Sequence, residues 1–280
     1  MDLRAYLLER LPLVERALDA ALPPAAAEPA VLHAAMRHLL FPGGKRLRPA
    51  LALASAEAMG APPARALPVA VAVELVHTYS LIHDDLPCMD DDATRRGRPT
   101  VHVTYGEATA VLAGDALLAA AFFALTAAES EHPAPRLLAA ARDLAEAAGS
   151  LHLVGGQVDD LRLQARELDA ARIESVHARK SAALIAAAIV GGARLGGGGA
   201  TELARLRRFG EKLGLAFQIA DDLLDADRSE ACSLVRVLGA PAARARAEAL
   251  LAEALAELDG IGERAEPLRE LARHAVRRSE

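Results

Sequence analysis

Apolar residues recur along almost the whole chain at the spacing of one face of an α-helix, and no convincing run alternates apolar and polar positions. The pattern predicts an all-α protein. Proline and glycine divide it into roughly ten helices. Because no Pro-rich or Ser-rich linker and no internal repeat is evident, we expect a single helical domain over residues 1–280. Residues 242–257 are expected to form an amphipathic surface helix.

The helical pattern is inverted in the segment 217–225. Gln218, Asp221, Asp222 and Asp225 share one helix face, while apolar residues cover the other faces. No lysine stands within four residues of these acids, so their charges repel one another unless a cation neutralises them. Ligand sets made only of oxygen favour Mg²⁺ over zinc or copper. The plain alternative is a solvated polar face.

A second acidic cluster follows an apolar helix that the pattern predicts over 69–82. The cluster and the arginines after it are His83, Asp84, Asp85, Asp90, Asp91, Asp92, Arg95, Arg96 and Arg98. His77 lies two turns before Asp84 on nearly the same face. Mg²⁺ usually bridges carboxylates to substrate phosphates. Two acidic clusters with arginines nearby therefore predict a diphosphate held through metal; alternatively, the arginines pair with the neighbouring acids.

A glycine turn followed by basic residues, GGKRLRP at 43–49, leads into another apolar helix. Backbone amides and positive charge at a helix start favour anion binding, and arginine binds phosphate oxygens as a two-pronged fork. The segment lacks the spacing of a P-loop, and no predicted strand precedes it. We interpret the segment as a candidate anion site, although this signal alone is not specific.

Composition and charge narrow the class of protein. The chain is 52% hydrophobic but only 3% aromatic, which favours helices built from Ala, Leu and Val. Its net charge of −6 argues against nucleic acid as the main partner. Cys88 and Cys232 are too few for a disulfide framework, and the charged opening segment lacks a signal-peptide centre, so we expect a cytoplasmic protein. The most apolar window, 116–125, is too short to span a bilayer, and we expect no stable membrane insertion.

Together these segments resemble the trans-polyprenyl diphosphate synthase family of the farnesyl/geranylgeranyl type. The resemblance covers nearly the whole chain, and two aspartate-rich motifs in this order are highly specific. The segments that resemble the family are GGKRLRP (43–49), ELVHTYSLIHDDLPCMDDDATRRGRPT (74–100), AGDALL (113–118), GGQVDD (155–160), HARKSAALI (177–185) and GLAFQIADDLLD (214–225). The resemblance implies an all-α bundle around a deep central cavity, usually a homodimer.

The resemblance also implies the roles of individual residues. Mg²⁺ ions are implied to bind Asp84, Asp85, Asp90, Asp221, Asp222 and Asp225. Isopentenyl diphosphate is implied to contact Lys45, Arg48, His77 and Arg96. The allylic substrate is implied to face Arg95, Lys180, Ser181 and Gln218, of which Arg95, Lys180 and Gln218 act in catalysis. In the implied reaction, metals and cations stabilise the departing diphosphate, isopentenyl diphosphate attacks the allylic cation, and proton loss gives a product longer by one isoprene unit.

Product length in this family is set by side chains beneath the first motif. Tyr79, five residues before Asp84, is the candidate floor of the cavity, with Ser80 beside it. An aromatic residue there resembles bacterial farnesyl diphosphate synthases, so we expect farnesyl diphosphate as the product. The alternatives are geranylgeranyl and geranyl diphosphate. A core tyrosine with a hydrogen-bonded hydroxyl is the plain interpretation, and it is compatible with this role.

The chain departs from the family pattern after the second motif. The segment 226–239 is shorter than in most relatives and lacks their lysines, one of which normally helps to hold the allylic diphosphate. Arg228 or Arg236 is a candidate substitute. Ser181 stands where threonine is more usual, and the exchange keeps the hydroxyl.

Two other functions remain as alternatives. A terpene cyclase of the same fold would carry an Asn/Ser/Glu metal motif where this chain has its second aspartate motif. A weakly active or non-catalytic partner subunit would typically lose one acidic motif, and this chain keeps both. The shortened segment keeps the partner-subunit alternative open.

Overall fold

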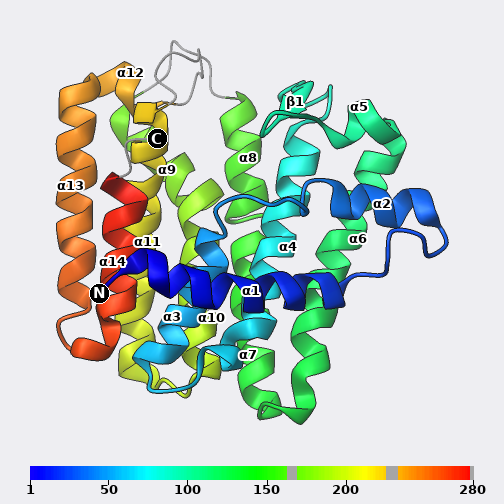
Figure 1. Ribbon diagram of the computed structural model, residues 1–280. Coiled ribbons are helices and arrows are strands. Elements are labelled where there is room, and N and C mark those ends of the chain that lie inside the picture. The colour runs from blue at the N-terminus through cyan, green and yellow to red at the C-terminus, as the bar shows by residue number, and fades with distance from the viewer. Residues whose placement is uncertain (163–168, 225–232, 278–280) are drawn as a thin grey trace.

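The computed structural model describes residues 1–162, 169–224 and 233–277, and over these ranges the chain folds as the predicted all-α bundle (Figure 1). The first half comprises α1 (Leu3–Ala21), α2 (Ala30–His38), α3 (Leu47–Ala58), α4 (Leu67–Asp84), α5 (Val101–Tyr105), α6 (Glu107–Thr126) and α7 (Ala134–Ala148). The second half comprises α8 (Leu153–Arg162), α9 (Ala170–His177), α10 (Ala183–Leu195), α11 (Ala200–Leu224), α12 (Leu234–Leu238), α13 (Ala240–Glu257) and α14 (Glu266–Arg277). The shorter helical turns are η1 (Pro63–Ala66), η2 (Ala127–Ser130), η3 (Ala178–Ala182) and η4 (Glu263–Ala265).

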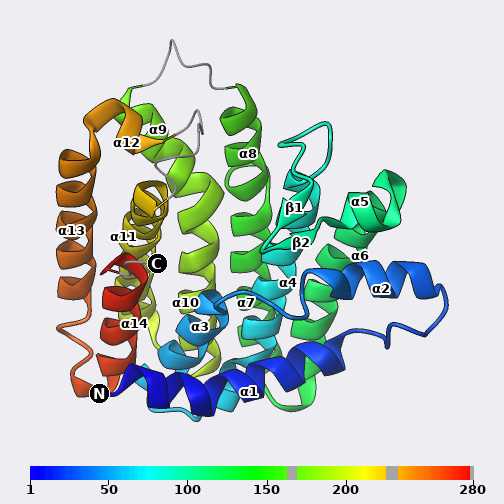
Figure 2. The ribbon, with the colours of Figure 1, turned by 45° about the horizontal axis from the view of Figure 1, so that its top comes forward.

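The long helices stand side by side, and α1 crosses them on one side of the bundle (Figures 1 and 2). Helix α4 packs against α6 and α3, α10 packs against α3 and α11, and α11 packs against α13. The predicted amphipathic helix over 242–257 is confirmed as α13, whose buried face includes Ala247 and Leu250. The packing places α4 and α11, which carry the two acidic motifs, on either side of α10 and α3.

Two apolar clusters form the core, and α10 joins them. One cluster gathers around α4 and α6, and the other around α11, α13 and α14. Leu184 of α10 packs in the first cluster, while the adjacent Ile185 packs in the second. Because α10 contributes to both clusters, nearly all of its residues are buried and apolar.

The described ranges contain one β-sheet, a small antiparallel hairpin of β1 (Thr94–Arg95) and β2 (Arg98–Pro99). Arg96 and Gly97 form its turn, both with positive φ, as expected for a tight two-residue hairpin. Strands of two residues are too short to show an alternating pattern, so the sequence did not predict them. The hairpin is important because it presents Arg95 and Arg96 beside the first acidic motif.

Two helical segments, Pro63–Asp84 and α6, are long and apolar enough to cross a membrane by length and composition alone. The first is largely buried and carries Glu74, His77 and Asp84, which is typical of a core helix. Helix α6 has 20 residues, more than the apolar window at 116–125 had indicated, and much of its surface is uncovered. The expectation of no membrane insertion stays a prediction.

Candidate active site

Both acidic motifs lie at the same end of the bundle. Asp84 is the last residue of α4, and Asp221 and Asp222 stand in the last turn of α11. The hairpin that follows α4 and the helix α12 that follows α11 both lie at this end (Figures 1 and 2). Asp225 lies outside the described residues, as do Arg228 and Cys232.

Asp84 and Asp90 are brought together by a turn at the end of α4. The Asp90 amide donates to the Asp84 carbonyl across 2.9 Å, and Asp91 next to it adopts a positive φ of 54°. Burial raises the pKa of Asp84 to about 7; Lys180 opposes this shift, and the charges of Asp90 and Asp160 add to it. The pKa of Asp90 is also raised, chiefly by burial. Two buried carboxyls therefore lie close together with Lys180 beside them, and a cation bound there would favour their charged forms.

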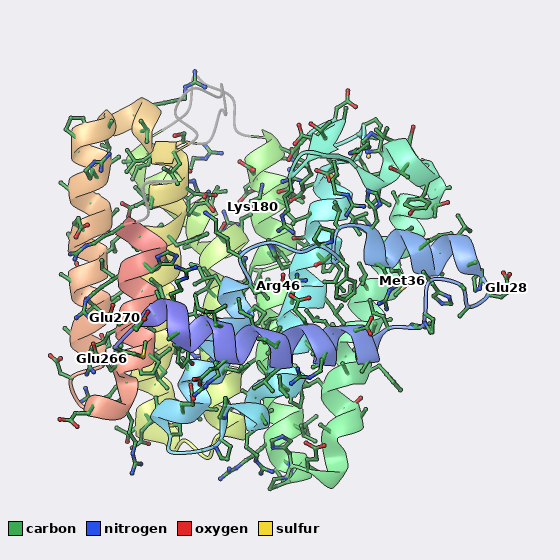
Figure 3. The ribbon with its side chains drawn as sticks, in the orientation of Figure 1. Glu28, Met36, Arg46, Lys180, Glu266 and Glu270 are labelled. Carbon is green, nitrogen blue, oxygen red and sulfur yellow. The ribbon has the colours of Figure 1, made fainter. Side chains whose placement is uncertain are left out.

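Lys180 and Ser181 lie next to each other in a single turn of π-helix, η3, and bond to two different helices, α8 and α11. The Lys180 ammonium donates to Asp160 of α8 across 2.6 Å (Figure 3), and Ser181 Oγ donates to Gln218 Oε1 of α11 across 2.7 Å. Burial lowers the pKa of Lys180, but the carboxylates of Asp160 and Asp84 outweigh it and raise that pKa. Adjacent residues can therefore reach opposite sides of the site. π-Helical turns of this kind are frequent at functional sites.

Asp85 is directed away from this carboxylate pair and toward the hairpin. It is fully buried, and Arg95 Nε donates to its Oδ1 across 2.5 Å. Arg95 also donates to Asp92 across 3.2 Å. This pairing agrees with the alternative interpretation, in which the arginines pair with the neighbouring acids. Burial raises the pKa of Asp85, and Arg95 opposes the shift. In this structure Arg95 is thus engaged by the first motif itself.

The two described acids of the second motif have different surroundings. Asp222 is only 5% exposed; its carboxylate accepts from the Leu234 amide at 3.0 Å and from Gln218 Nε2 at 3.3 Å, and His177 Nε2 lies 3.8 Å away. Asp221 interacts electrostatically with Arg48. No lysine stands near these acids in the sequence, but their basic partners are supplied by other parts of the chain, which spacing along one helix cannot reveal.

Two arginine cations and one histidine lie beside the carboxylates, and this group is called the cation cluster below. It combines Arg48 at the start of α3, His77 of α4 and Arg96 of the hairpin. Burial, followed by Arg48 and Arg96, lowers the pKa of His77 well below its usual value, so its ring is neutral. Arg48 Nε is buried without a hydrogen-bond partner among the described residues. An orphaned guanidinium N–H amid like charges fits an anionic ligand.

Lys45, the remaining predicted contact of isopentenyl diphosphate, is exposed on the loop before α3. This loop approaches the hairpin closely at Gly44, where a Cβ would lie 2.6 Å from Arg96 Nη2. A side chain at Gly44 would therefore displace the Arg96 guanidinium from its present place beside the basic loop.

The carboxylates suit a metal that shares its ligands with a substrate. Within the described ranges no three acidic, histidine or cysteine side chains are already grouped around a common point. Asp84 and Asp90 nevertheless offer neighbouring carboxylate oxygens, and Asp221 lies near the cation cluster. Oxygen donors from a few carboxylates, completed by water and phosphate, are the ligand set that Mg²⁺ prefers.

Some residues at the site were not predicted from the sequence. Asp160 accepts the hydrogen bond of the Lys180 ammonium. Gly156, one turn earlier, lets α8 pack closely on η3, because a Cβ there would lie 2.5 Å from the backbone nitrogen of Lys180. Both residues belong to the GGQVDD segment, which contributed to the family resemblance but had no predicted role in the site. Gln157 of the same segment has a buried amide with no hydrogen-bond partner in the described part of the chain.

The fold and site together define an all-α protein that brings carboxylates and a cation cluster to one end of a helical bundle, as diphosphate-binding isoprenoid synthases do. The model of the polyprenyl synthetase family matches residues 29–256. The chain belongs to this family.

Curated relatives and solved structures are similar over long stretches. The chain is 46% identical over 233 residues to the heterodimeric geranylgeranyl pyrophosphate synthase large subunit 1 of Arabidopsis thaliana, a match to 81% of this chain and 62% of that protein. It thus spans less than two thirds of that relative. Identity is 41% over 287 residues to geranylgeranyl pyrophosphate synthase of Capsicum annuum, covering 97% of this chain and 77% of that protein.

Among solved structures, an FPP/GFPP synthase from Zymomonas mobilis superposes with a TM-score of 0.90 at 38% identity, covering 98% of this chain and 99% of that one. A geranyltransferase from Helicobacter pylori superposes with a TM-score of 0.87 at 30% identity, covering 99% of each chain. The expected family and the all-α fold are therefore confirmed.

Proposed function

We propose that the protein is a Mg²⁺-dependent prenyltransferase that condenses isopentenyl diphosphate with an allylic diphosphate, and that its main product is geranylgeranyl diphosphate. One observation carries the proposal: two anion-binding environments of different composition lie side by side. The first combines Lys180 with the carboxylates of Asp84 and Asp90, and the second combines Arg48, His77 and Arg96. Two such environments suit two diphosphate substrates, one held through metal and one held by cations directly.

Asp84, Asp90 and Asp221 would hold Mg²⁺, which when bound neutralises the allylic diphosphate and makes it a better leaving group. Lys180 and the Ser181–Gln218 pair orient this diphosphate from opposite sides. Arg48 and Arg96 bind the diphosphate of isopentenyl diphosphate, and neutral His77 donates an N–H to it. The chain's own residues thus bind and align two substrates, so that the double bond of one faces the carbon that the diphosphate leaves.

The names of the curated relatives support geranylgeranyl diphosphate as the product. The expected farnesyl product gains no support from them. It is kept as a second candidate because of Tyr79, which is 6% exposed and packs edge-on against His83 with ring centroids 5.7 Å apart. A rigid aromatic ring one and a half turns below Asp84 would limit how far a prenyl tail can extend.

Product sizing tests the proposal. The purified protein is incubated with isopentenyl diphosphate, Mg²⁺ and each of dimethylallyl, geranyl and farnesyl diphosphate, and products are separated by chain length. Elongation of farnesyl diphosphate supports geranylgeranyl synthesis, whereas products that stop at farnesyl support the second candidate. Asp84→Asn and a chelator serve as matched controls that should abolish turnover. Absence of elongation with every starter would overturn the proposal and favour a partner subunit.

We also propose that two copies of the chain associate through α6. Helix α6 is strongly apolar yet exposes Leu112 and Phe123, the latter to 71%. An apolar face of this kind normally marks an interaction site. A Phe123→Asp variant should then elute as a monomer in light-scattering chromatography while the parent elutes as a dimer. A monomeric parent protein would contradict the association.

A further inference from the structure

Arg46 lies in the middle of the basic loop but points away from its neighbours. Its backbone has φ 52° and ψ 35°, the left-handed region that non-glycine residues rarely occupy, and only 3% of the residue is exposed. The preceding Lys45 is exposed. Figure 3 shows Arg46 in the interior of the bundle, near α1. Because this conformation is unfavourable by itself, the surroundings of the side chain must hold it there.

The Arg46 guanidinium joins three parts of the chain. Its Nη1 donates to Glu74 of α4 at 2.7 Å, its Nε donates to Glu15 of α1 at 2.7 Å, and its Nη2 donates to the Leu40 carbonyl at 2.5 Å. The guanidinium also covers Gly43, where any side chain would overlap it. The glycine before the basic residues is therefore explained by Arg46, just as Gly44 is explained by Arg96.

Glu74 is the buried acid that faces the cation cluster. It is 3% exposed and stands one turn before His77 on the same helix face. Its charge acts on Arg48 and Arg96 as well as on Arg46, and it opposes the lowering of their pKa values by burial. Three arginines thus share the buried Glu74 carboxylate, while Glu15 is the second acidic partner of Arg46, Asp85 also acts on Arg96 and Asp221 also acts on Arg48.

We propose that Arg46, Glu74 and Glu15 are positioning residues of the isopentenyl diphosphate site. Arg46 holds the loop that carries Lys45 and Arg48 against α4, which carries His77, and Glu15 extends this support to α1. None of these three residues contacts the substrate. They set the spacing of Arg48 and His77, which do. This inference rests on the proposed function and adds residues to which neither the family motifs nor the sequence analysis assigned a role.

Arg46→Lys and Glu15→Gln test the proposal. Lysine keeps a positive charge next to Glu74, so no acid is left buried alone, but its ammonium cannot match the fork of three directed contacts. We expect the KM for isopentenyl diphosphate to rise about tenfold in Arg46→Lys and about threefold in Glu15→Gln, the scale of lost charge-assisted hydrogen bonds. The KM for the allylic substrate should change less than about twofold, since Lys180 and Ser181 stand on η3.

Arg10→Gln is the matched control. Arg10 joins α1 to α3 through Glu57 at 2.7 Å, an ion pair of the same kind that lies outside the basic loop. The control should lower the melting temperature without changing the ratio of the two KM values. If Arg46→Lys and Glu15→Gln behave like Arg10→Gln, or raise both KM values equally, the residues are merely structural and the inference is wrong.

Calorimetric titration with isopentenyl diphosphate separates this inference from the proposed function. A parent protein that neither binds isopentenyl diphosphate nor elongates refutes the proposed function. A parent protein that binds and elongates, with Glu15→Gln and Arg46→Lys unchanged in Kd, refutes only the positioning role. A weaker Kd in both variants with an unchanged allylic KM supports it.

Discussion

The Lys180 ammonium donates a hydrogen bond to Asp160 across 2.6 Å, so an acid outside both aspartate-rich motifs holds the lysine that we propose to orient the allylic diphosphate. The geometry depends on Gly156, which lets α8 pack closely on η3. Asp84 and Asp90 act on the same ammonium through space. Lys180 is thus aligned before any substrate arrives, which reduces the entropy cost of binding.

Asp160→Asn should weaken allylic binding. The amide keeps the shape of the side chain but removes the charge that orients Lys180, and we expect the allylic KM to rise about tenfold. Steady-state kinetics with geranyl diphosphate measures this change. Asp159→Asn is a matched control on the adjacent residue, which pairs with Arg179 instead. Equal effects of the two substitutions would contradict the role given to Asp160.

The stability of the metal-free protein should depend on the ionisation of Asp84. Burial raises the pKa of its carboxyl from 3.8 to about 7. The folded state therefore binds the proton more tightly than the unfolded state, and the stability gained from protonation is full below pH 4 and is lost as the pH rises through about 7. Asp84→Asn removes this loss.

We expect Asp84→Asn to melt at a higher temperature than the parent above pH 7 and at a similar temperature near pH 4, when both are freed of metal. Calorimetry across this pH range measures the difference. Asp2→Asn at the exposed start of α1 serves as the control. A melting difference that does not vary with pH would show that Asp84 is not titrating in this range.

A close contact between α4 and α6 should make Gly114 sensitive to any side chain. A methyl group on Gly114 would overlap Nε2 of His83, which lies 3.0 Å from the Val111 carbonyl. Gly114→Ala should therefore displace the half-buried His83 ring and destabilise the protein by about 1 kcal/mol, the scale of one lost hydrogen bond, measured by urea unfolding. His83→Ala in the same chain should relieve part of this cost, so the two changes should be non-additive. Strict additivity would mean that the two residues do not meet.

Helical spacing predicts which residues share a face of one helix, but not which residues meet across two helices. Spacing showed that Asp221 and Asp222 share a helix face, and the structure confirms the helix up to Leu224. It could not show that Asp222 meets His177 and the Leu234 amide, because those partners come from other helices. The same reason explains why Asp85, adjacent to Asp84, is bound to Arg95.

Backbone conformation set a second limit on prediction. The sequence predicts an anion site at the basic loop, but the inward direction of Arg46 depends on its left-handed backbone, which residue type does not indicate. The metal ligands, the single domain over residues 1–280 and the cytoplasmic location stay predictions. The family resemblance, in contrast, was carried by motifs spread along the chain and is confirmed.

Tyr79 should decide between the two candidate products. Its ring is buried on α4 below Asp84, so Tyr79→Ala should open space there and lengthen the main product by at least one isoprene unit, measured by product sizing with Mg²⁺ and isopentenyl diphosphate. The substitution should also cost about 3 kcal/mol of unfolding free energy, as truncation of a buried aromatic residue does. Tyr79→Phe keeps the ring and should leave the product unchanged. If Tyr79→Ala folds and elongates but gives the parent product, the ring does not limit chain length.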